Sequence, residues 1–207
     1  MKVNNPLTGI LNSKVKIECL RHLCNYPAEL NGRQLSRFLK ITPKSIHKAM
    51  NALVDEGVVH CNAHGNSFGY SLNKEKWITK RLLLSLFQNE KTFLETIIQK
   101  IKKEIELLVF KKSILSVVLF GSVQRQEDTC HSDFDILLLV DKEDNVSKAE
   151  EEIEKIGTKL TKVYGVTLGP YVKSLSSFKK DKSLDVIKSI VSSHYLIYGQ
   201  EISKYGR

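Results

Sequence analysis

The sequence predicts an α+β protein with three parts: an N-terminal domain of helices and a hairpin, a helical linker, and a C-terminal domain that combines strands with helices. Apolar residues recur at helical spacing through the first third of the chain and are followed by two short runs typical of strands. A long amphipathic stretch comes next. The C-terminal part contains two short apolar runs bounded by polar residues, which are typical of buried strands. We therefore place the domains at residues 1–75, 76–112 and 113–207.

The composition is that of an ordinary globular chain, with 207 residues of which 42% are apolar and 27% charged. No segment approaches the ~18 consecutive apolar residues of a membrane span, and no signal-peptide pattern opens the chain, so we expect a cytoplasmic protein. The formal net charge is +9, and residues 1–75 carry ten Lys or Arg against five Asp or Glu. Such a basic domain suggests a polyanionic partner, although alone it indicates only a solvated surface. The four cysteines lack zinc spacing, and we expect reduced thiols.

Three helices are predicted in the first third, and two of them carry clear start and stop signals. The first helix is expected at 13–25, and Asn31 can cap the second. The inward residues of the second helix are expected to be Leu35, Phe38 and Leu39. Thr42 is a good N-cap for the third helix and Pro43 suits its first turn. Gly57 is expected to end it.

A predicted hairpin completes this domain, with strands at 58–63 and 67–72 around the turn His64-Gly65-Asn66. The order helix, helix, short turn, helix, hairpin resembles the winged helix-turn-helix of bacterial and archaeal transcription regulators, over about residues 10–75. The resemblance implies DNA binding, with the third helix in the major groove. The implied DNA-binding residues are Arg33, Arg37, Lys44, Ser45, Lys48, Asn51, His64 and Asn66. Helix-turn-helix pairs also occur in purely structural roles, and that alternative stays open.

The stretch from Lys76 to Lys112 is predicted to be one long helix or two helices broken near Asn89. Its apolar residues recur every three or four positions, at Leu82, Leu83, Leu86, Phe87, Phe93, Ile97, Ile101, Ile105 and Leu108. This face can pack on both domains or pair with a second copy of the chain. Because winged-helix regulators generally meet two half-sites as symmetric pairs, we expect a homodimer.

The stretch that predicts chemistry follows the first buried strand of the C-terminal part. Gly121 and Ser122 end that strand, and after ten residues Asp133 and Asp135 open the next one. Positions i and i+2 of a strand share a face, so the two carboxylates are expected side by side. They repel each other, and a divalent cation such as Mg²⁺ relieves the repulsion while binding phosphate oxygens. Because Gly121 leaves room for a phosphate, the stretch predicts a metal–triphosphate site; the alternative is a pair of acids that decorates an edge strand.

The run Phe120-Gly121-Ser122, ten residues and then Asp133-Phe134-Asp135-Ile136 resembles the signature of the DNA polymerase β-like nucleotidyltransferases, specifically the minimal nucleotidyltransferases. The resemblance covers about residues 113–202. It implies a mixed sheet with helices on one face, and transfer of a nucleoside monophosphate from a nucleoside triphosphate with Mg²⁺ or Mn²⁺. It assigns Asp133 and Asp135 to catalysis and metal binding, and Gly121, Ser122 and Arg125 to the nucleotide. In the loop after Ser122, Gln126 stands where that branch usually has glycine.

The sequence departs from this resemblance at one point. Active members place a third carboxylate on a later strand, but the corresponding strand, expected at 166–172, contains no acid. That carboxylate normally helps to activate the attacking hydroxyl and to hold one of two metals. Glu127 and Asp128 in the loop could substitute for it. Two functions stay open: a DNA-binding enzyme that transfers a nucleoside monophosphate to a hydroxyl, and a transcriptional regulator whose nucleotidyltransferase-like domain is a sensor or scaffold.

Two further helices are predicted in the C-terminal part, at 147–164 and 184–193. The residues expected to face inward are Ile153, Ile156, Leu160, Val163, Val186, Ile187 and Ile190. His194 follows the second of these helices. We expect it to be a packing residue rather than a catalyst, because nothing in the sequence pairs it with a base.

Overall fold

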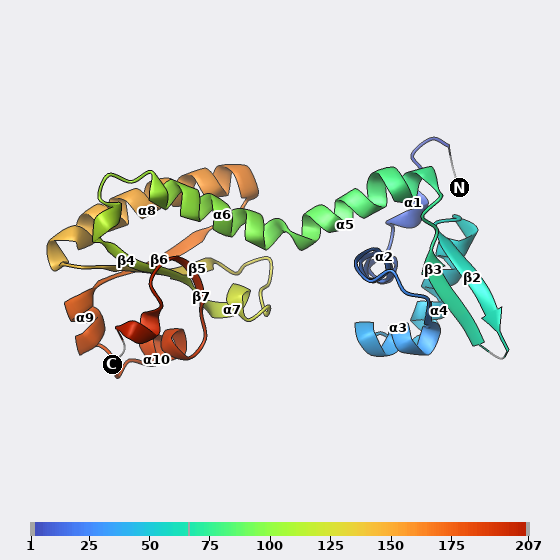
Figure 1. Cartoon of the computed structure of the whole chain (residues 1–207). Coiled ribbons are helices and arrows are strands. Elements are labelled where there is room, and N and C mark those ends of the chain that lie inside the picture. Colours follow the sequence, from blue (N-terminus) through green and yellow to red (C-terminus); the bar gives the residue numbers. More distant parts are fainter. Residues whose placement is uncertain (1–2, 66, 206–207) are drawn as a thin grey trace. The chain divides into compact units, whose positions relative to one another are not determined.

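The computed structural model describes residues 3–65 and 67–205. The chain divides into two compact units, Met1–Phe93 and Leu94–Arg207, whose elements are labelled in Figure 1. Each unit has its own buried core. The two units are therefore described separately.

The segment predicted to be a linker is shared between the units. A π-helical turn, Thr79–Leu83, leads into α5 (Leu84–Lys91) in the first unit. α6 (Phe93–Glu106) lies almost entirely in the second unit. The helical stretch is broken at Thr92, close to Asn89, so the prediction of two helices is the one that the structure supports.

The first unit packs its helices around a three-stranded antiparallel sheet of order β1-β3-β2. Its elements before the π-helical turn are α1 (Leu7–Ile10), α2 (Lys14–Asn25), β1 (Leu30–Asn31), α3 (Gly32–Leu39), α4 (Pro43–Asp55), β2 (Val59–His64) and β3 (Ser67–Leu72). Strands β2 and β3 pair as a hairpin, from Val59 opposite Leu72 to His64 opposite Ser67. The predicted helices and hairpin are thus present. Asn66, in the predicted turn, lies outside the described residues.

Helices α3 and α4 begin where the cap signals predicted them. The Oδ1 atom of Asn31 accepts a hydrogen bond from the Gln34 amide at 2.9 Å, and Oε1 of Gln34 accepts one from the Asn31 amide at 2.8 Å. This capping box begins α3. Thr42 caps α4, and Pro43 is its first residue. Gly57, which follows α4, has a φ of 71°, the left-handed conformation that commonly ends a helix.

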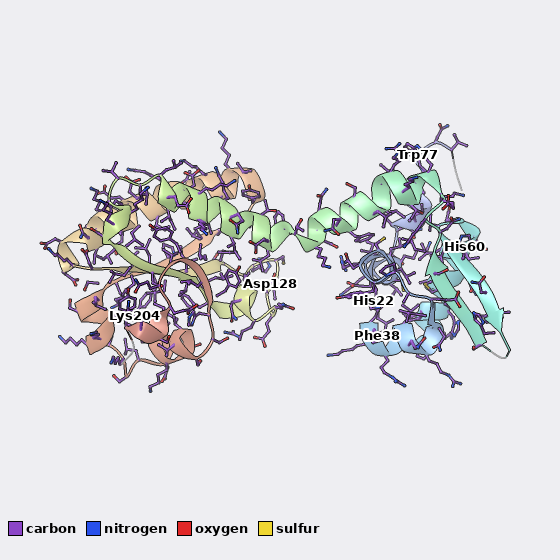
Figure 2. The ribbon with its side chains drawn as sticks, in the orientation of Figure 1. His22, Phe38, His60, Trp77, Asp128 and Lys204 are labelled. Carbon is purple, nitrogen blue, oxygen red and sulfur yellow. The ribbon has the colours of Figure 1, made fainter. Side chains whose placement is uncertain are left out.

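The core of the first unit is formed by α2, α3, α4, the sheet and α5. Its buried residues include Leu20, Leu23, Leu35, Ile46, Met50, Leu53, Tyr70 and Phe87. The prediction that Phe38 faces inward is wrong, because its side chain is 59% exposed and its ring stacks on His22 with centroids 5.3 Å apart (Figure 2). α3 has only eight residues, and the side chains that it directs into the core are those of Leu35 and Leu39. Phe38 therefore lies at the rim of the core.

The second unit is built on a four-stranded sheet of order β6-β5-β4-β7. Its elements after α6 are β4 (Ile114–Leu119), α7 (Gly121–Gln124), β5 (Phe134–Val140), α8 (Val146–Tyr164), β6 (Leu168–Ser174), α9 (Leu175–Lys180), α10 (Asp185–Ser192) and β7 (Tyr195–Gly199). Strands β5 and β6 are parallel, whereas β4 pairs antiparallel with both β5 and β7. The mixed sheet implied by the resemblance is confirmed.

Helices cover both faces of this sheet, so the expectation of helices on one face is wrong (Figure 1). Ile136 and Leu138 of β5 pack with α6 and α8, whereas Leu137 and Leu139 pack with α9 and α10. Successive residues of a strand point to opposite faces, so an uninterrupted apolar run needs cover on both sides. Residues 136–140 of β5 are such a run, Ile-Leu-Leu-Leu-Val.

Two residues predicted to face inward are exposed instead. Val163 is 67% exposed, because Tyr164 takes the inward position in the last turn of α8. Val186 is 38% exposed, because the inward stripe of α10 consists of Ile187 and Ile190. The other predicted inward residues of these two helices are buried.

Candidate nucleotide site and candidate DNA interface

The two acids of the motif lie at the start of β5, which begins at Phe134. Phe134 is buried in the core formed with α6 and α8, so Asp133 and Asp135 project to the opposite face. In the parallel pairing of β5 and β6, Gly169 lies opposite Asp135. A β-carbon on Gly169 would lie 2.9 Å from Oδ1 of Asp135 and 3.5 Å from the β-carbon of Asp133. The structure therefore brings both acids to one point beside β6.

Gly121 contacts the carboxylate of Asp135. The Phe120 amide donates a hydrogen bond to the carbonyl oxygen of Asp135 at 3.0 Å, which holds the turn between β4 and α7 against β5. A β-carbon on Gly121 would lie 2.2 Å from Oδ2 of Asp135. Gly121 also has a φ of 78°, a conformation that favours glycine. Both the space and the backbone therefore require glycine at this position.

The electrostatics of the pair favour a bound cation. Burial raises the pKa of Asp135 above its ordinary value and the neighbouring Asp133 carboxylate raises it further, whereas Arg125 lowers it. Ionisation of Asp135 is thus opposed by desolvation and by repulsion, and a cation would relieve both. Two carboxylates are hard oxygen donors that fit Mg²⁺ or Mn²⁺, with nucleotide phosphates and water as the remaining ligands. Within the described ranges, the structure contains no group of three or more His, Cys, Asp or Glu side chains that could hold a metal ion.

The loop between α7 and β5 holds Arg125 near this pair. Nε of Arg125 lies 2.8 Å from Oε2 of Glu127, and both side chains are exposed. Glu127, one of the two loop acids that could substitute for the missing carboxylate, is therefore already paired with a cation. Gln126 has a φ of 59°, so a non-glycine residue adopts the left-handed conformation where the resembling family usually has glycine. Within the same loop, the Ser132 hydroxyl accepts a hydrogen bond from the Thr129 amide at 2.9 Å.

The positions of β6 beside the acids carry no carboxylate. Gly169 lies opposite Asp135, and continuing the same register places Thr167 beside Asp133. The Phe134 amide donates a hydrogen bond to the Thr167 carbonyl at 2.8 Å, which fixes this alignment. An acid at residue 169 would start from a β-carbon only 2.9 Å from a carboxylate oxygen. Position 169 therefore has little room for a third acid, and Thr167, the residue before β6, is the other position aligned with the pair.

Two contacts around the site were not predicted. The Ser193 hydroxyl donates a hydrogen bond to Oε1 of Gln124 at 3.0 Å, which joins the end of α10 to α7. No local pattern predicts it, because the residues are far apart in the sequence. Ser122 is half-buried, and its carbonyl accepts a hydrogen bond from the Glu127 amide at 2.9 Å.

His194 was expected to be a packing residue. It lies 2.7 Å from the Ile190 carbonyl and 2.9 Å from Oε2 of Glu201, so both of its ring nitrogens have structural partners.

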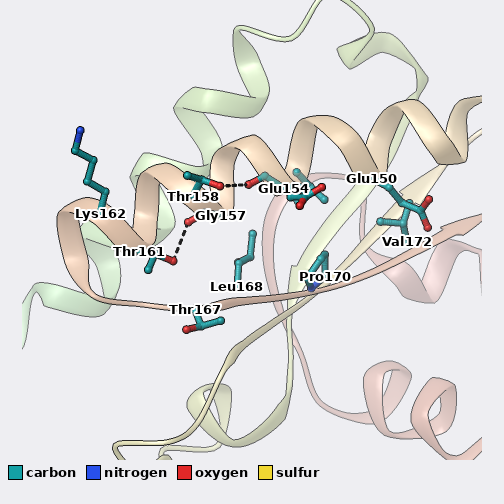
Figure 3. Close-up of a pocket in the computed structure, with 11 residues that line it drawn as sticks. Glu150, Glu154, Gly157, Thr158, Thr161, Lys162, Thr167, Leu168, Pro170 and Val172 are labelled. Carbon is teal, nitrogen blue, oxygen red and sulfur yellow. Dashed lines mark hydrogen bonds between the residues drawn. The ribbon is translucent and has the colours of Figure 1, made fainter.

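A separate groove lies on the opposite face of the sheet, between α8 and β6 (Figure 3). Its volume is about 760 Å³. The β6 side chains that line it include Leu168, Pro170 and Val172, which alternate with Gly169 along the strand. Thr167, the residue before β6, also lines the groove.

The residues predicted to contact DNA include an exposed stripe on α4. Lys44, Lys48 and Asn51 are exposed and fall at i, i+4 and i+7, on one face of the helix. Ile46, Ala49, Met50 and Leu53 form the buried face. On α3, Arg33 and Arg37 are exposed as well. The structure thus leaves the basic side chains of both helices accessible.

Two other residues predicted to contact DNA, Ser45 and His64, are placed differently. Ser45 is half-buried, and its hydroxyl accepts a hydrogen bond from the Thr42 hydroxyl at 3.0 Å. His64 on β2 is exposed, but its Nε2 atom is bonded to the Glu29 carboxylate. The same carboxylate accepts a hydrogen bond from the Asn62 side chain at 2.7 Å. Asn66 is outside the part of the chain that the structure describes.

The second unit defines the class of the protein. The chain belongs to the family described as "Polymerase beta, Nucleotidyltransferase", whose match spans residues 99–203 and includes the Gly-Ser turn and both aspartates. One similar solved structure is described as a toxin–antitoxin with AMP-PNP; it is 19% identical, covers 53% of this chain and 80% of that chain, and has a TM-score of 0.35. Another is a mutant of the toxin–antitoxin MntA-HpeT, at 18% identity, the same coverage and a TM-score of 0.34. No curated protein matches the chain.

In residues 3–65 and 67–205, no helix is both long enough and apolar enough to cross a membrane.

Proposed function

We propose that the protein is a DNA-binding regulator that binds a metal–nucleoside triphosphate in its second unit without efficient nucleotidyl transfer. The observation that carries this proposal is the absence of a carboxylate at Thr167, just before β6, and at Gly169 on β6, the two positions aligned with the aspartates. DNA binding is assigned to a winged helix-turn-helix at residues 1–75. The nucleotide is assigned to residues 113–207, and the helical segment 76–112 connects the two.

The first unit supports DNA binding through its order of elements. Three helices are followed by a hairpin, and β1, between α2 and α3, adds a third strand to the sheet. This is the order of a winged helix-turn-helix, in which α4 would be the recognition helix. Lys44 and Lys48 on its exposed face would bind phosphates or bases, and Asn51 could read an adenine. Arg33 and Arg37 on α3 would add contacts to the backbone.

The second unit supports nucleotide binding through the contact between Gly121 and Asp135. Gly121 lets a phosphate approach the backbone, and Arg125 brings a positive charge near the acids. Asp133 and Asp135 would hold Mg²⁺ or Mn²⁺, and Ser122 would donate its hydroxyl to a phosphate. When bound, the ion neutralises phosphate charge and orients the triphosphate.

Nucleotidyl transfer is the second candidate function, and the retention of both aspartates favours it. In this reaction an acceptor hydroxyl oxygen bonds to the α-phosphorus, the bond from that phosphorus to the bridging oxygen breaks, and pyrophosphate leaves. The hydroxyl proton must pass to a base. The aligned positions that would supply this base are Thr167, just before β6, and Gly169 on β6, neither of which can accept the proton at neutral pH.

A homodimer is proposed through the helical segment of the first unit. Leu82 is 37% exposed and Leu86 is 48% exposed, at helical spacing on one face. These two large apolar residues on one exposed face are the proposed interaction surface. A symmetric pair would present two copies of α4 to two half-sites of DNA.

The experiment that tests this function compares the full chain with the Asp133→Asn/Asp135→Asn variant. Binding of radiolabelled ATP is measured with Mg²⁺ or Mn²⁺, and label transfer is measured with cell extract as the source of acceptors. We expect metal-dependent binding that the variant loses, and no transfer above the level of the variant. Transfer that depends on the aspartates would establish the second candidate instead. Equal ATP binding by both proteins would contradict both.

A further inference from the structure

The first unit contains a cavity of about 430 Å³ that none of the assignments above explains. It is lined by Asn31, Gly32, Arg33, His47, Ser67 and Phe68. These residues come from the start of α3, the side of α4 and the first residues of β3. None of them is acidic. The cavity therefore joins the three elements that a winged helix-turn-helix presents to DNA.

His47 is held in position by two neighbours. Its Nδ1 atom lies 3.2 Å from the hydroxyl of Tyr70, whose side chain is 1% exposed. With Tyr70 as donor, Nδ1 is the acceptor and the hydrogen of the neutral ring is on Nε2. On the other side, a β-carbon on Gly32 would lie 2.9 Å from Cε1 and 3.0 Å from Nε2 of His47. Because Gly32 has no side chain, the imidazole of His47 can lie next to it at the cavity wall.

The chemistry of the lining suits a phosphate group. Arg33 offers a guanidinium and, within the part of the chain that is described, makes no ion pair. His47 adds an N–H donor. The side chain of Asn31 accepts the α3 capping bond through Oδ1, which leaves its NH₂ group as a further donor. A cavity lined by donors and a cation, with no carboxylate, favours a small anion with several acceptor oxygens.

We infer that this cavity binds a phosphodiester of the DNA backbone, an inference that rests on the proposed DNA binding. His47 lies on α4 between Lys44 and Lys48, so a strand that contacts those lysines passes the cavity. Phe68, 54% exposed on β3, would lie against the adjoining sugar. Phosphate contacts fix the register of a recognition element on the duplex. Arg33 and His47 would therefore position α4, whereas Asn51 would read bases.

The test uses a substitution that removes no charge. Gly32→Ala would displace the His47 ring from its position at the cavity wall, and alanine is compatible with the first turn of a helix. DNA affinity of the full chain is measured by fluorescence anisotropy on a random-sequence duplex over a series of salt concentrations. We expect Gly32→Ala to weaken binding several-fold and to lower the slope of log K against log salt by about 1, as Arg33→Ala would. The control Lys74→Ala, which removes an exposed charge outside the cavity, should keep the affinity within about twofold.

The outcomes separate this inference from the proposed function. The wild type is expected to bind DNA. If Gly32→Ala and Arg33→Ala then both show the wild-type affinity and the wild-type slope of log K against log salt, the cavity is not a phosphate site. If the wild type binds no duplex, the DNA-binding proposal fails and this inference fails with it. A further arm titrates AMP and inorganic phosphate. Saturable AMP binding that Gly32→Ala abolishes, with DNA binding unchanged, would assign the cavity to a free nucleotide and overturn the inference.

Discussion

Gly121 and Asp135 are in direct contact in the candidate site, because a β-carbon on Gly121 would lie 2.2 Å from Oδ2 of Asp135. The glycine that leaves room for a phosphate is therefore also the residue against which the carboxylate rests. The peptide that follows β4 is tied to β5 by the hydrogen bond from Phe120 to the Asp135 carbonyl. A change at Gly121 consequently acts on the position of the acid as well as on the backbone.

Gly121→Ala is predicted to destabilise the second unit and to abolish nucleotide binding. The new methyl group would displace the Asp135 carboxylate, and the φ of 78° is unfavourable for alanine. Strain of this kind costs about 1–3 kcal/mol. Urea unfolding measures the loss of stability, and a thermal shift with Mg²⁺ and ATP measures binding.

Gly165→Ala is the matched control, because Gly165 has a φ of 68° but faces open space. The free energy of unfolding of this variant should fall by about 1 kcal/mol, because alanine is strained in the left-handed conformation, and nucleotide binding should be unchanged. If Gly121→Ala bound nucleotide as well as Gly165→Ala does, the contact with Asp135 would have no role in the site.

Asp135→Asn is predicted to stabilise the ligand-free protein at neutral pH. Burial and the Asp133 carboxylate raise the pKa of Asp135, so folding favours its protonated form. The ionised form therefore lowers the free energy of unfolding once the pH exceeds the pKa of an unfolded Asp, about 4. The gain in melting temperature of the variant should be present at pH 7 and should shrink as the pH falls toward that value. An equal gain at both pH values would mean that the stabilisation does not come from ionisation.

Thr167→Asp is predicted to introduce nucleotidyl transfer. The substitution places a carboxylate at the residue before β6, which a continuation of the β5–β6 register aligns with Asp133. The new acid would accept the proton of the attacking hydroxyl and add a metal ligand. Label transfer should rise at least about tenfold above wild type, equivalent to ~1.4 kcal/mol in the barrier. Thr167→Asn, which has the same shape without the charge, should remain at the wild-type level, and equal transfer by the two variants would contradict the assignment.

Much of the local structure was predictable, because the signals lie within a few residues of their effects. The side chains of Asn31 and Thr42 bond to amides in the first turns of the helices that they cap. The mixed sheet and its acidic pair could be predicted because the motif combines two strands with a turn. Phe134 identifies the inner face of β5, and Asp133 and Asp135 therefore share the other.

The remaining features depend on contacts between segments far apart in the sequence. Gly169 lies opposite Asp135 because of the register between β5 and β6. The sequence of β6 alone does not predict that register. The bond between Ser193 and Gln124 depends on how α10 packs. Phe38 was predicted to be buried from helical spacing alone, yet its exposure depends on which element covers that end of α3.

Lys44→Ala/Lys48→Ala is predicted to weaken DNA binding and to flatten its salt dependence. Both lysines are exposed on the same face of α4. If each neutralises one phosphate, the slope of log K against log salt should fall by about 2. Lys74→Ala/Lys80→Ala removes the same charge from exposed positions outside α3, α4 and the hairpin, and should leave the slope unchanged. Equal effects of the two double variants would show that binding depends on net charge rather than on α4.

Leu82→Glu/Leu86→Glu is predicted to convert a dimer to a monomer. Both leucines are part of one exposed apolar face before and within α5, and charged residues there would be buried against the partner chain. The dissociation constant of the dimer should rise by at least about tenfold, or ~1.4 kcal/mol, as measured by sedimentation equilibrium. Leu107→Glu, at a leucine that is 79% exposed outside this face, should dimerise like the wild type. A wild-type chain that remains monomeric at all concentrations would refute this surface as an interface, whereas a dimer unaffected by the double substitution would locate the interface elsewhere.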